Sequence, residues 1–551
     1  MRRKNINKSL PPDAPLRHDD HSRPISRRDF IRQGFMGGSA TLLSGGLFSL
    51  FANPNAAQAA VSNDLQALID SIPSCNLSSS TGGVPFICFD LAGGANLAGS
   101  NVMVGQGGGQ MDLLSTAGYS KLGIPGDMIP GLDSTGVTLL NSSAANDFTN
   151  DDLNLIFHAD SAMLRGILEK GSATIGNVDG CVIPARSDND TGNNPHNPLY
   201  GLAMTGAKGE IVDLIGSRSS DSGGNSMAPA SQINPEVRPT KVDRPSDVTG
   251  MVDVGNLTAV LTDGNDVTAV MESIARLSHR KLQLGDISTG LSNDAVIKDL
   301  IRCGYIKTAD IANRFATRPP IDPTLDPDIQ AIFSGTELMD NEFSKTASVM
   351  KMVLNGFAAG GCITMGGYDY HTGDRRTGEN RDLRAGRCIG ACLEYARRLT
   401  ISSGINTPLM IYVFSDGSVA SNGMPDDTTT SGSLETLSLG GGGKGQWTGD
   451  NSSTACSFFL VYSPTGAPVL SVNGRPEALH RQIGSFNAGA SVVTSATPAA
   501  NNPNLLVNML LLNYMAVNGD ITPSNTAAFT NIFPNHGLGG NLGNYIAFAA
   551  L

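Results

Sequence analysis

The chain has 551 residues, 38 of them basic and 50 acidic, which gives a formal net charge of −12 at neutral pH. A negatively charged surface disfavours binding to nucleic acid and to anionic lipid head groups, so we expect neither as a partner. Hydrophobic residues make up 40% of the chain and charged residues 16%, with 65 glycines, which excludes an intrinsically disordered protein and predicts a compact fold with many loops.

The first feature along the chain is typical of an export signal. The segment Ser26-Arg27-Arg28-Asp29-Phe30-Ile31 precedes a weakly apolar stretch at about 34–52, and Ala57-Gln58-Ala59 has the small-x-small pattern of a signal-peptidase site. We therefore expect residues 1–59 to be a twin-arginine signal peptide that engages the Tat translocase during export. The mature protein would be periplasmic or secreted, with no stable membrane span after cleavage. An uncleaved N-terminal anchor is the alternative.

Cleavage would make the chain more acidic. The first 59 residues contain nine basic and four acidic residues, so the mature part would keep 29 basic and 46 acidic residues and carry a formal charge of −17. Such a surface repels anionic substrates unless a metal ion or a basic pocket offsets the field locally. The twin-arginine route exports folded proteins, often already loaded with a cofactor or metal, and is therefore compatible with a bound metal.

Short apolar runs alternate with helical patterns along the remaining chain. In chain order, we predict strands at 84–89 and 153–158, helices at 162–170 and 343–359, a strand at 362–365, a helix at 382–400, strands at 409–414 and 457–462, and a helix at 504–517. Each strand ends near Gly, Asp or Ser, and Asp160 or Ser161 would cap the helix at 162. This alternation predicts an α/β fold with a parallel sheet covered on both faces.

Two segments depart from the alternation. Residues 205–340 carry proline-rich loops and helical patches at 267–283 and 294–303, as a peripheral insertion would. Residues 418–455 are dominated by Gly, Ser, Thr and Asp, which predicts a long surface loop suited to a lid. We therefore predict one domain over 60–551, with an insertion at about 205–340 and a glycine-rich loop at 418–455.

All eight cysteines lie beyond residue 59, an even number that would allow disulfides in an oxidising compartment. Folding before export takes place in a reducing cytoplasm, however, so the fold cannot depend on such bonds. Cys88 and Cys456 lie in apolar runs, as core residues do, and Cys388 and Cys392 have a helical spacing that suits a disulfide poorly. The chain has no Cys-x-x-Cys pair, which disfavours a thiolate zinc site.

Polar residues follow the carboxyl ends of the predicted strands, where open α/β sheets bind ligands. They are Asp90 with Asn96, Asp160 with Ser161, Asp369 with His371, and Asp416. Asp369 and His371 are two apart in extended chain, so both side chains would point to one side and could hold one cation, with Asp416 as a third ligand. The alternatives are a turn-capping Asp beside a hydrogen-bonded His, and an Asp-Gly turn at Asp416.

The densest polar run is at 185–198. It offers Ser187 and Thr191 as hydroxyl nucleophiles, and its Asp-x-Asp pattern is similar to calcium-loop chemistry without the EF-hand spacing. A surface loop held together by Asx turns is the alternative. Ser161 is a further nucleophile candidate, although helix capping is the simpler role for it.

At these residues the chain resembles the bacterial DUF1501 proteins, which are typically twin-arginine exported and related to the alkaline phosphatase and sulfatase superfamily. The resemblance runs over about 84–520 and rests on Phe89-Asp90-Leu91-Ala92-Gly93-Gly94-Ala95-Asn96, Gly367-Tyr368-Asp369-Tyr370-His371 and Phe414-Ser415-Asp416-Gly417. It implies a three-layer α/β/α sandwich with a mostly parallel, doubly wound sheet and a metal-assisted hydrolytic site at the strand ends. Asp369, His371 and Asp416 would be metal ligands, and Ser187 would lie near the nucleophile.

The chain also departs from that family. Asn96 stands where the family usually has Asp, with Asp90 as a possible substitute ligand, and the late Asp-His-Gly motif is absent. The leading hypothesis is an exported hydrolase of small anionic phosphate or sulfate esters that uses a divalent zinc, calcium, magnesium or manganese ion. The alternative is a catalytically inactive relative that acts as a binding or export-accessory factor. A redox enzyme is a third possibility, but the chain carries no cofactor motif for it.

Overall fold

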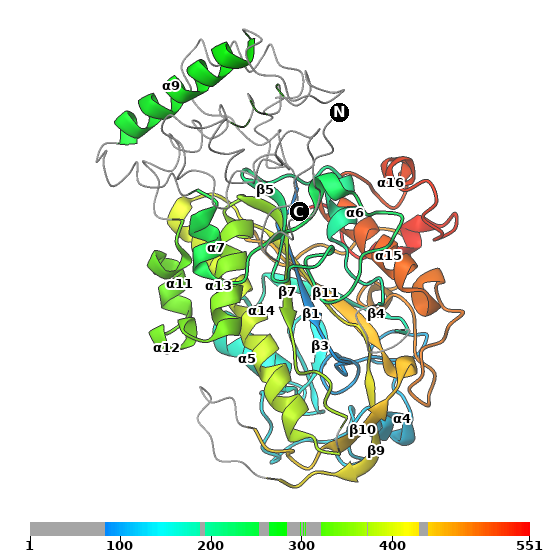
Figure 1. Cartoon of the computed structure of the whole chain (residues 1–551). Coiled ribbons are helices and arrows are strands. Elements are labelled where there is room, and N and C mark those ends of the chain that lie inside the picture. Colours follow the sequence, from blue (N-terminus) through cyan, green and yellow to red (C-terminus); the bar gives the residue numbers. More distant parts are fainter. Residues whose placement is uncertain are drawn as a thin grey trace, which may run out of the picture.

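Figure 1 shows a computed structural model of the chain, which describes residues 83–187, 193–252, 264–283, 298, 301, 304, 321–371, 373–428 and 439–551. The predicted signal peptide at 1–59 and the predicted nucleophile Thr191 lie outside these residues. Within the described part of the chain, no helix combines the length and the apolarity that a membrane span requires.

Among the described residues, seven strands form a central sheet in the order β4-β11-β8-β1-β7-β5-β6. The strands from β8 through β1, β7 and β5 to β6 are parallel, whereas β11 runs antiparallel to both β8 and β4. They span Phe86–Leu91 (β1), Val178–Pro184 (β4), Val212–Gly216 (β5), Thr240–Lys241 (β6), Ala358–Met365 (β7), Leu409–Ser415 (β8) and Cys456–Tyr462 (β11). The prediction of an α/β fold with a mostly parallel sheet is confirmed.

The central strand β1 shows why the sheet is buried on both sides. All of its residues are buried, and their side chains alternate between two hydrophobic cores, with Ile87 and Phe89 in one and Phe86 and Cys88 in the other. A parallel strand buried on both faces needs a nearly continuous apolar run, which is the pattern found at 84–89 and at 409–414.

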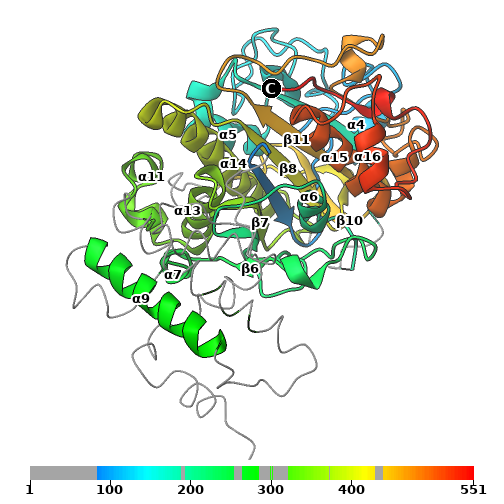
Figure 2. The same cartoon turned by 90° about the horizontal axis from the view of Figure 1, so that it is seen from above.

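Three helices cover one face of the sheet: α5 (Ala162–Gly171), α13 (Asn341–Leu354) and α14 (Arg376–Ser403) (Figures 1 and 2). Helices α5 and α14 touch backbone to backbone, because Gly166 and Gly386 meet at their crossing. A Cβ atom added to either glycine would fall well inside van der Waals contact with the other helix's backbone. This contact places α5 against the middle of α14, around residues 383–387.

The opposite face is covered by α6 (Leu199–Met204) and α15 (Pro503–Val517), with α16 (Ala527–Ile532) packed beside them (Figure 2). Helix α15 is apolar around nearly its whole circumference, as expected of a helix buried in a large protein. It begins after Asn502, whose side chain accepts hydrogen bonds from the backbone N–H groups of Asn504 and Leu505.

The remaining elements lie outside the sheet. Two antiparallel hairpins are formed by β2 (Thr149–Leu153) with β3 (Leu155–His158) and by β9 (Val419–Pro425) with β10 (Gly445–Asp450). Among the described residues, the other α-helices are α4 (Thr116–Lys121), α7 (Pro245–Gly250), α9 (Gly264–Gln283), α11 (Pro327–Ile332) and α12 (Gly335–Leu338). Short 3-10 helices lie at Ser172–Thr174, Pro235–Val237, Pro323–Leu325, Ser452–Thr454, Glu477–Leu479, Pro498–Asn501 and Leu542–Tyr545.

Several predicted elements are confirmed. The helices at 162–170 and 504–517 agree with α5 and α15 to within one residue at each end, and Ser161 caps α5 by accepting from the Leu164 N–H at 3.1 Å. The helix at 382–400 is longer in the structure, and the helix at 343–359 ends at Leu354 because the chain turns there into β7. The six described cysteines are buried free thiols, as expected of core residues, and Cys75 and Cys303 lie outside the described part.

Other predictions are wrong. The strand at 153–158 is not part of the central sheet, because Asn154 adopts a left-handed conformation (φ 59°) that ends β2 and starts β3. The segment at 205–340 is not wholly peripheral, since β5 and β6 belong to the central sheet; its second helical patch, at 294–303, lies mostly outside the described residues. The described parts of 418–455 contain the β9–β10 hairpin, where a plain loop is predicted.

Candidate functional site

The carboxyl ends of β1, β7 and β8 meet at one edge of the sheet, since the three strands are parallel neighbours. Asp90 lies near the end of β1, Asp416 directly follows β8, and Asp369 and His371 follow β7. The loop after β1 separates these residues into two groups. Gly93 in that loop donates its N–H to Asp416 Oδ1 at 2.8 Å on one side and packs against the backbone of Asp369 on the other.

Asp90 is fully buried and is held by the loop that follows β5. Its Oδ2 atom accepts from the backbone N–H groups of Asn225 and Ser226, both at 2.7 Å, and its Oδ1 atom accepts from Ser226 Oγ at 3.1 Å. Burial raises the pKa of Asp90 above its ordinary value, although these hydrogen bonds act in the opposite direction. The oxygens of Asp90 that a metal would need are therefore already used by protein donors.

Asp416 is buried in the same way. Besides the contact with Gly93, its Oδ2 atom accepts from the side-chain amide of Asn225 at 2.9 Å, and its backbone carbonyl accepts from the side-chain amide of Asn194. Asn225 thus connects the Asp90 and Asp416 carboxylates. The predicted ligand Asn96 is also structural, because its amide donates to the Val419 carbonyl at 2.9 Å, while its buried Oδ1 atom has no hydrogen-bond partner.

Asp369 and His371 do lie together, and their partner is Asp450. His371 Nε2 is 2.5 Å from Asp369 Oδ1 and 3.7 Å from Asp450 Oδ1. The three ligand atoms all lie within 4.8 Å of one another, and no other group of three such residues occurs in the described part of the chain. The side chains are 64%, 36% and 49% exposed for Asp369, His371 and Asp450, so solvent reaches all three. The same-side placement predicted for Asp369 and His371 is confirmed.

Alternation along the segment after β7 explains how the pair is presented. Tyr368 and Tyr370 are fully buried, whereas Asp369 and His371, which alternate with them, reach solvent. The Tyr368 hydroxyl donates to a carbonyl of α14 at 2.9 Å, and the Tyr370 hydroxyl accepts from the Asn96 N–H at 2.9 Å. The two tyrosines therefore anchor the segment and turn the carboxylate and the imidazole outward.

Asp450 reaches the pair through a short backbone bridge. It is the last residue of β10, and Trp447 in the same strand donates its N–H to the Asp374 carbonyl at 2.9 Å. The Trp447 carbonyl accepts from the Gly373 N–H, also at 2.9 Å. Because residues 373 and 374 follow His371 closely, this bridge brings the end of β10 beside it. Sequence reasoning missed Asp450, since no local pattern at 450 indicates a partner nearly eighty positions earlier.

The remaining predicted residues are placed elsewhere. The expectation that Asp416 joins Asp369 and His371 is wrong, because Asp416 is not in the group and turns its oxygens toward Gly93 and Asn225. Ser187 is buried, and its Oγ atom has no hydrogen-bond partner. Ser161 is a helix cap whose hydroxyl donates to Asn101 Oδ1 at 2.8 Å.

The donor set at Asp369, His371 and Asp450 fits a divalent cation. Two carboxylates and one imidazole suit zinc or manganese, while calcium and magnesium prefer oxygen ligands throughout. Ligand atoms around zinc lie about 3.3 Å apart for bonds of about 2.0–2.1 Å. The 3.7 Å separation from Asp450 is close to that value, and the shorter contact with Asp369 can lengthen because both side chains are solvent-exposed.

Compared with known proteins, the chain matches no protein-family model, no curated protein and no solved structure. The side chains described above are therefore the basis on which a function is assigned.

Proposed function

We propose that the protein is an exported protein that binds one divalent cation at Asp369, His371 and Asp450 and uses this centre to hydrolyse phosphate or sulfate esters. In this proposal the helices on both faces of the sheet form the three-layer α/β/α sandwich of alkaline-phosphatase-like proteins, and the chain is related to the DUF1501 proteins. The observation that carries the proposal is the convergence of three ligand atoms, from two distant segments, within 4.8 Å of one another.

The charge of the chain supports an anionic substrate only if a cation is present. A mature surface with a formal charge of −17 repels phosphate and sulfate esters, and a bound cation would reverse the potential locally. When bound, a divalent ion polarises an ester oxygen and stabilises the charge that develops on it. The exposed side chains of Asp369, His371 and Asp450 leave room for a substrate to approach from solvent.

The position of Ser187 favours a second candidate, a protein that binds the cation without hydrolysis. Ser187 follows β4, which is three strand positions from β1 in the sheet, and Asp369 packs against Gly93 in the loop after β1. At about 4.8 Å per strand, β4 and β1 themselves are about 14 Å apart, whereas an attacking atom must lie about 3–3.5 Å from its target. From β4, Ser187 is therefore badly placed to attack a substrate held at the cation, and the other predicted nucleophile, Thr191, lies outside the described residues. A binding or export-accessory protein would need no attacking group.

The two candidates are separated by one set of measurements on the purified mature protein. We expect about one zinc or manganese ion per chain, and an affinity that falls by at least about tenfold in each of Asp369→Asn, His371→Gln and Asp450→Asn. Asp427→Asn is the matched control, because Asp427 is an exposed carboxylate in the neighbouring loop after β9. The hydrolase is supported if the wild-type protein turns over aryl phosphates or aryl sulfates in a cation-dependent reaction and the three variants lose this turnover.

Cation binding without turnover supports the second candidate. If the wild-type protein binds no divalent cation, or if Asp427→Asn weakens binding as much as Asp450→Asn does, both candidates are overturned.

A further inference from the structure

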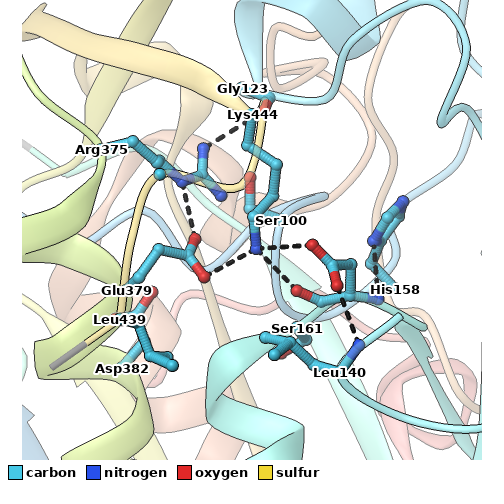
Figure 3. Close-up of polar contacts among 12 residues, drawn as sticks. Ser100, Gly123, Leu140, His158, Ser161, Arg375, Glu379, Asp382, Leu439 and Lys444 are labelled. Carbon is cyan, nitrogen blue, oxygen red and sulfur yellow. Dashed lines mark hydrogen bonds and ion pairs between the residues drawn. The ribbon is translucent and has the colours of Figure 1, made fainter. Parts of the chain in front are cut away.

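A buried cluster of charges lies at the start of β10, the strand that ends in the proposed ligand Asp450. The Lys444 ammonium is 2.6 Å from Glu379 Oε2 and 3.1 Å from Asp160 Oδ2, and it donates to the Asp160 carbonyl at 2.7 Å. The Lys444 and Glu379 side chains are each only 3% exposed. Figure 3 shows Lys444 and Arg375 on either side of the Glu379 carboxylate.

Arg375 extends the cluster to the strand that carries Asp450. Its Nε atom is 2.7 Å from Glu379 Oε1, and its Nη1 atom donates to the Gly445 and Gly123 carbonyls at 3.2 Å. The guanidinium lies 4.2 Å from the ring centroid of Trp447, a cation–π contact. Arg375 is therefore bound to the start of β10 through both the backbone and a side chain.

The charges are balanced but costly to bury. Lys444 and Arg375 face Glu379 and Asp160, so two cations meet two anions in the protein interior. Burial, the largest single effect, raises the pKa of Asp160, but the charges of Lys444 and His158 and the hydrogen bonds from Leu140 and Lys444 together outweigh it and hold the pKa below its ordinary value. Buried ion pairs seldom add net stability compared with apolar residues of similar size, whereas they do restrict how the bonded segments can pack. A positional role therefore accounts for the cluster better than stability does.

Both segments that supply the cation ligands are attached to this cluster. Lys444 directly precedes β10, which ends in Asp450, and Arg375 follows shortly after His371. Along both segments, the Trp447–Asp374 backbone bridge lies between the cluster residue and the proposed ligand. Movement of Lys444 away from Glu379 would release the start of β10 and, with it, the register that brings Asp450 to His371.

We infer that Lys444, through its buried contacts with Glu379 and Asp160, is a positioning residue that holds β10 against residues 373–375 and so keeps Asp450 beside His371. This inference deepens the proposed function, on which the cation-binding role of the three ligands rests. The anchoring of β10 itself can be measured without a cation, because Trp447 is the only tryptophan of the chain and is buried in contact with Arg375.

The test compares Lys444→Met with Lys351→Met in the mature protein. Lys351 is a matched control, because its ammonium is also buried and lies 2.7 Å from the carboxylate of Asp326. Lys351 is on α13 and Asp326 caps α11, two helices that lie far from β10 (Figures 1 and 2). Glu379→Gln is a milder second variant that removes one charge and keeps an amide oxygen as acceptor, in case Lys444→Met does not fold. The readouts are the tryptophan emission maximum without metal and the affinity for Mn²⁺.

We expect Lys444→Met and Glu379→Gln to shift the emission to longer wavelength and to weaken Mn²⁺ binding by about tenfold, whereas Lys351→Met changes neither. Unchanged emission and unchanged affinity in both test variants would overturn the inference and leave the proposed function intact. If the wild-type protein binds no Mn²⁺ but the two test variants still shift the emission, the anchoring of β10 is supported and the proposed function is overturned. An equal emission shift in Lys351→Met would show that losing any buried lysine loosens the fold, and this would overturn the inference.

Discussion

Asp382 makes the stability of this protein depend on pH in a direction that can be worked out from its surroundings. It lies on α14, and its fully buried carboxyl accepts one hydrogen bond, from the Asn101 side-chain amide at 2.8 Å, while Oδ1 has no hydrogen-bond partner. Burial, reinforced by the negative charge of Glu379, raises the pKa of Asp382 from its ordinary value of 3.8 to about 7. Asp382→Asn keeps the shape of the side chain and removes its ionisation.

The unfolded chain releases the Asp382 proton at a lower pH than the folded protein does, and this difference makes stability depend on pH. Below about pH 4 both the folded and the unfolded Asp382 are protonated, so ionisation does not affect stability. As the pH rises toward 7, the unfolded chain ionises while the folded carboxyl keeps its proton, and the free energy of unfolding therefore falls. With about 1.4 kcal/mol for each tenfold change in proton affinity, the whole loss is about 4 kcal/mol, of which about 3 kcal/mol is lost between pH 5 and pH 8.

The assay is urea unfolding of the wild-type protein and of Asp382→Asn at pH 5 and at pH 8. We expect the variant to gain about 3 kcal/mol relative to wild type between the two pH values. Burial lowers the pKa of His158 and of His196 to about 4, which destabilises the fold as the pH falls, but this contribution is the same in both proteins and cancels in the comparison. Equal pH dependence of the two proteins would refute the reasoning, and Asp127→Asn, at an exposed carboxylate, is the control.

Three further predictions concern contacts that the fold requires. Gly386→Ala should destabilise the protein by about 1–3 kcal/mol in urea unfolding, because the new methyl group meets the backbone of α5. Gly250→Ala, which has open space at its Cβ, is the control. Equal stability of the two variants would contradict the packing argument. Gly93→Ala should weaken Mn²⁺ binding by about tenfold, because Gly93 has a φ of +124° and a Cβ there would push against Asp369. Unchanged affinity would show that Asp369 is not held by this loop. Ser161→Ala should cost about 1 kcal/mol of stability through loss of the helix cap, measured by the urea midpoint, and a midpoint equal to wild type would argue against that cap.

Local chemistry explains the parts of the fold that could be predicted. The apolar run of β1 and the cap of α5 at Ser161 depend on neighbours in the chain, so their patterns are readable from the sequence. The outward placement of Asp369 and His371 is also local, because alternation in an extended segment fixes the side to which each residue points. Two of the three proposed ligands, Asp369 and His371, were accordingly predictable.

Strand β4 was not predictable from its own residues. Asp179 and Gly180 interrupt its apolar pattern and favour a turn in isolation. In the folded protein Asp179 is buried within the strand and lies 2.8 Å from Arg481, about three hundred positions away, which compensates for its charge. Burial raises the pKa of Asp179, and the contacts with Arg481 oppose that effect.

The proposed site likewise combines features that local sequence determines with features that only long-range packing determines. Residue order alone established the class of the fold, the edge of the sheet at which polar residues gather, and the pairing of Asp369 with His371. Long-range packing selected the third partner: the buried charges of Lys444, Glu379 and Arg375 and the Trp447 bridge bring Asp450 to His371, while Gly93 and Asn225 occupy the oxygens of Asp416. Contacts between segments this far apart depend on the energy of the whole folded chain, which no local pattern of residues encodes.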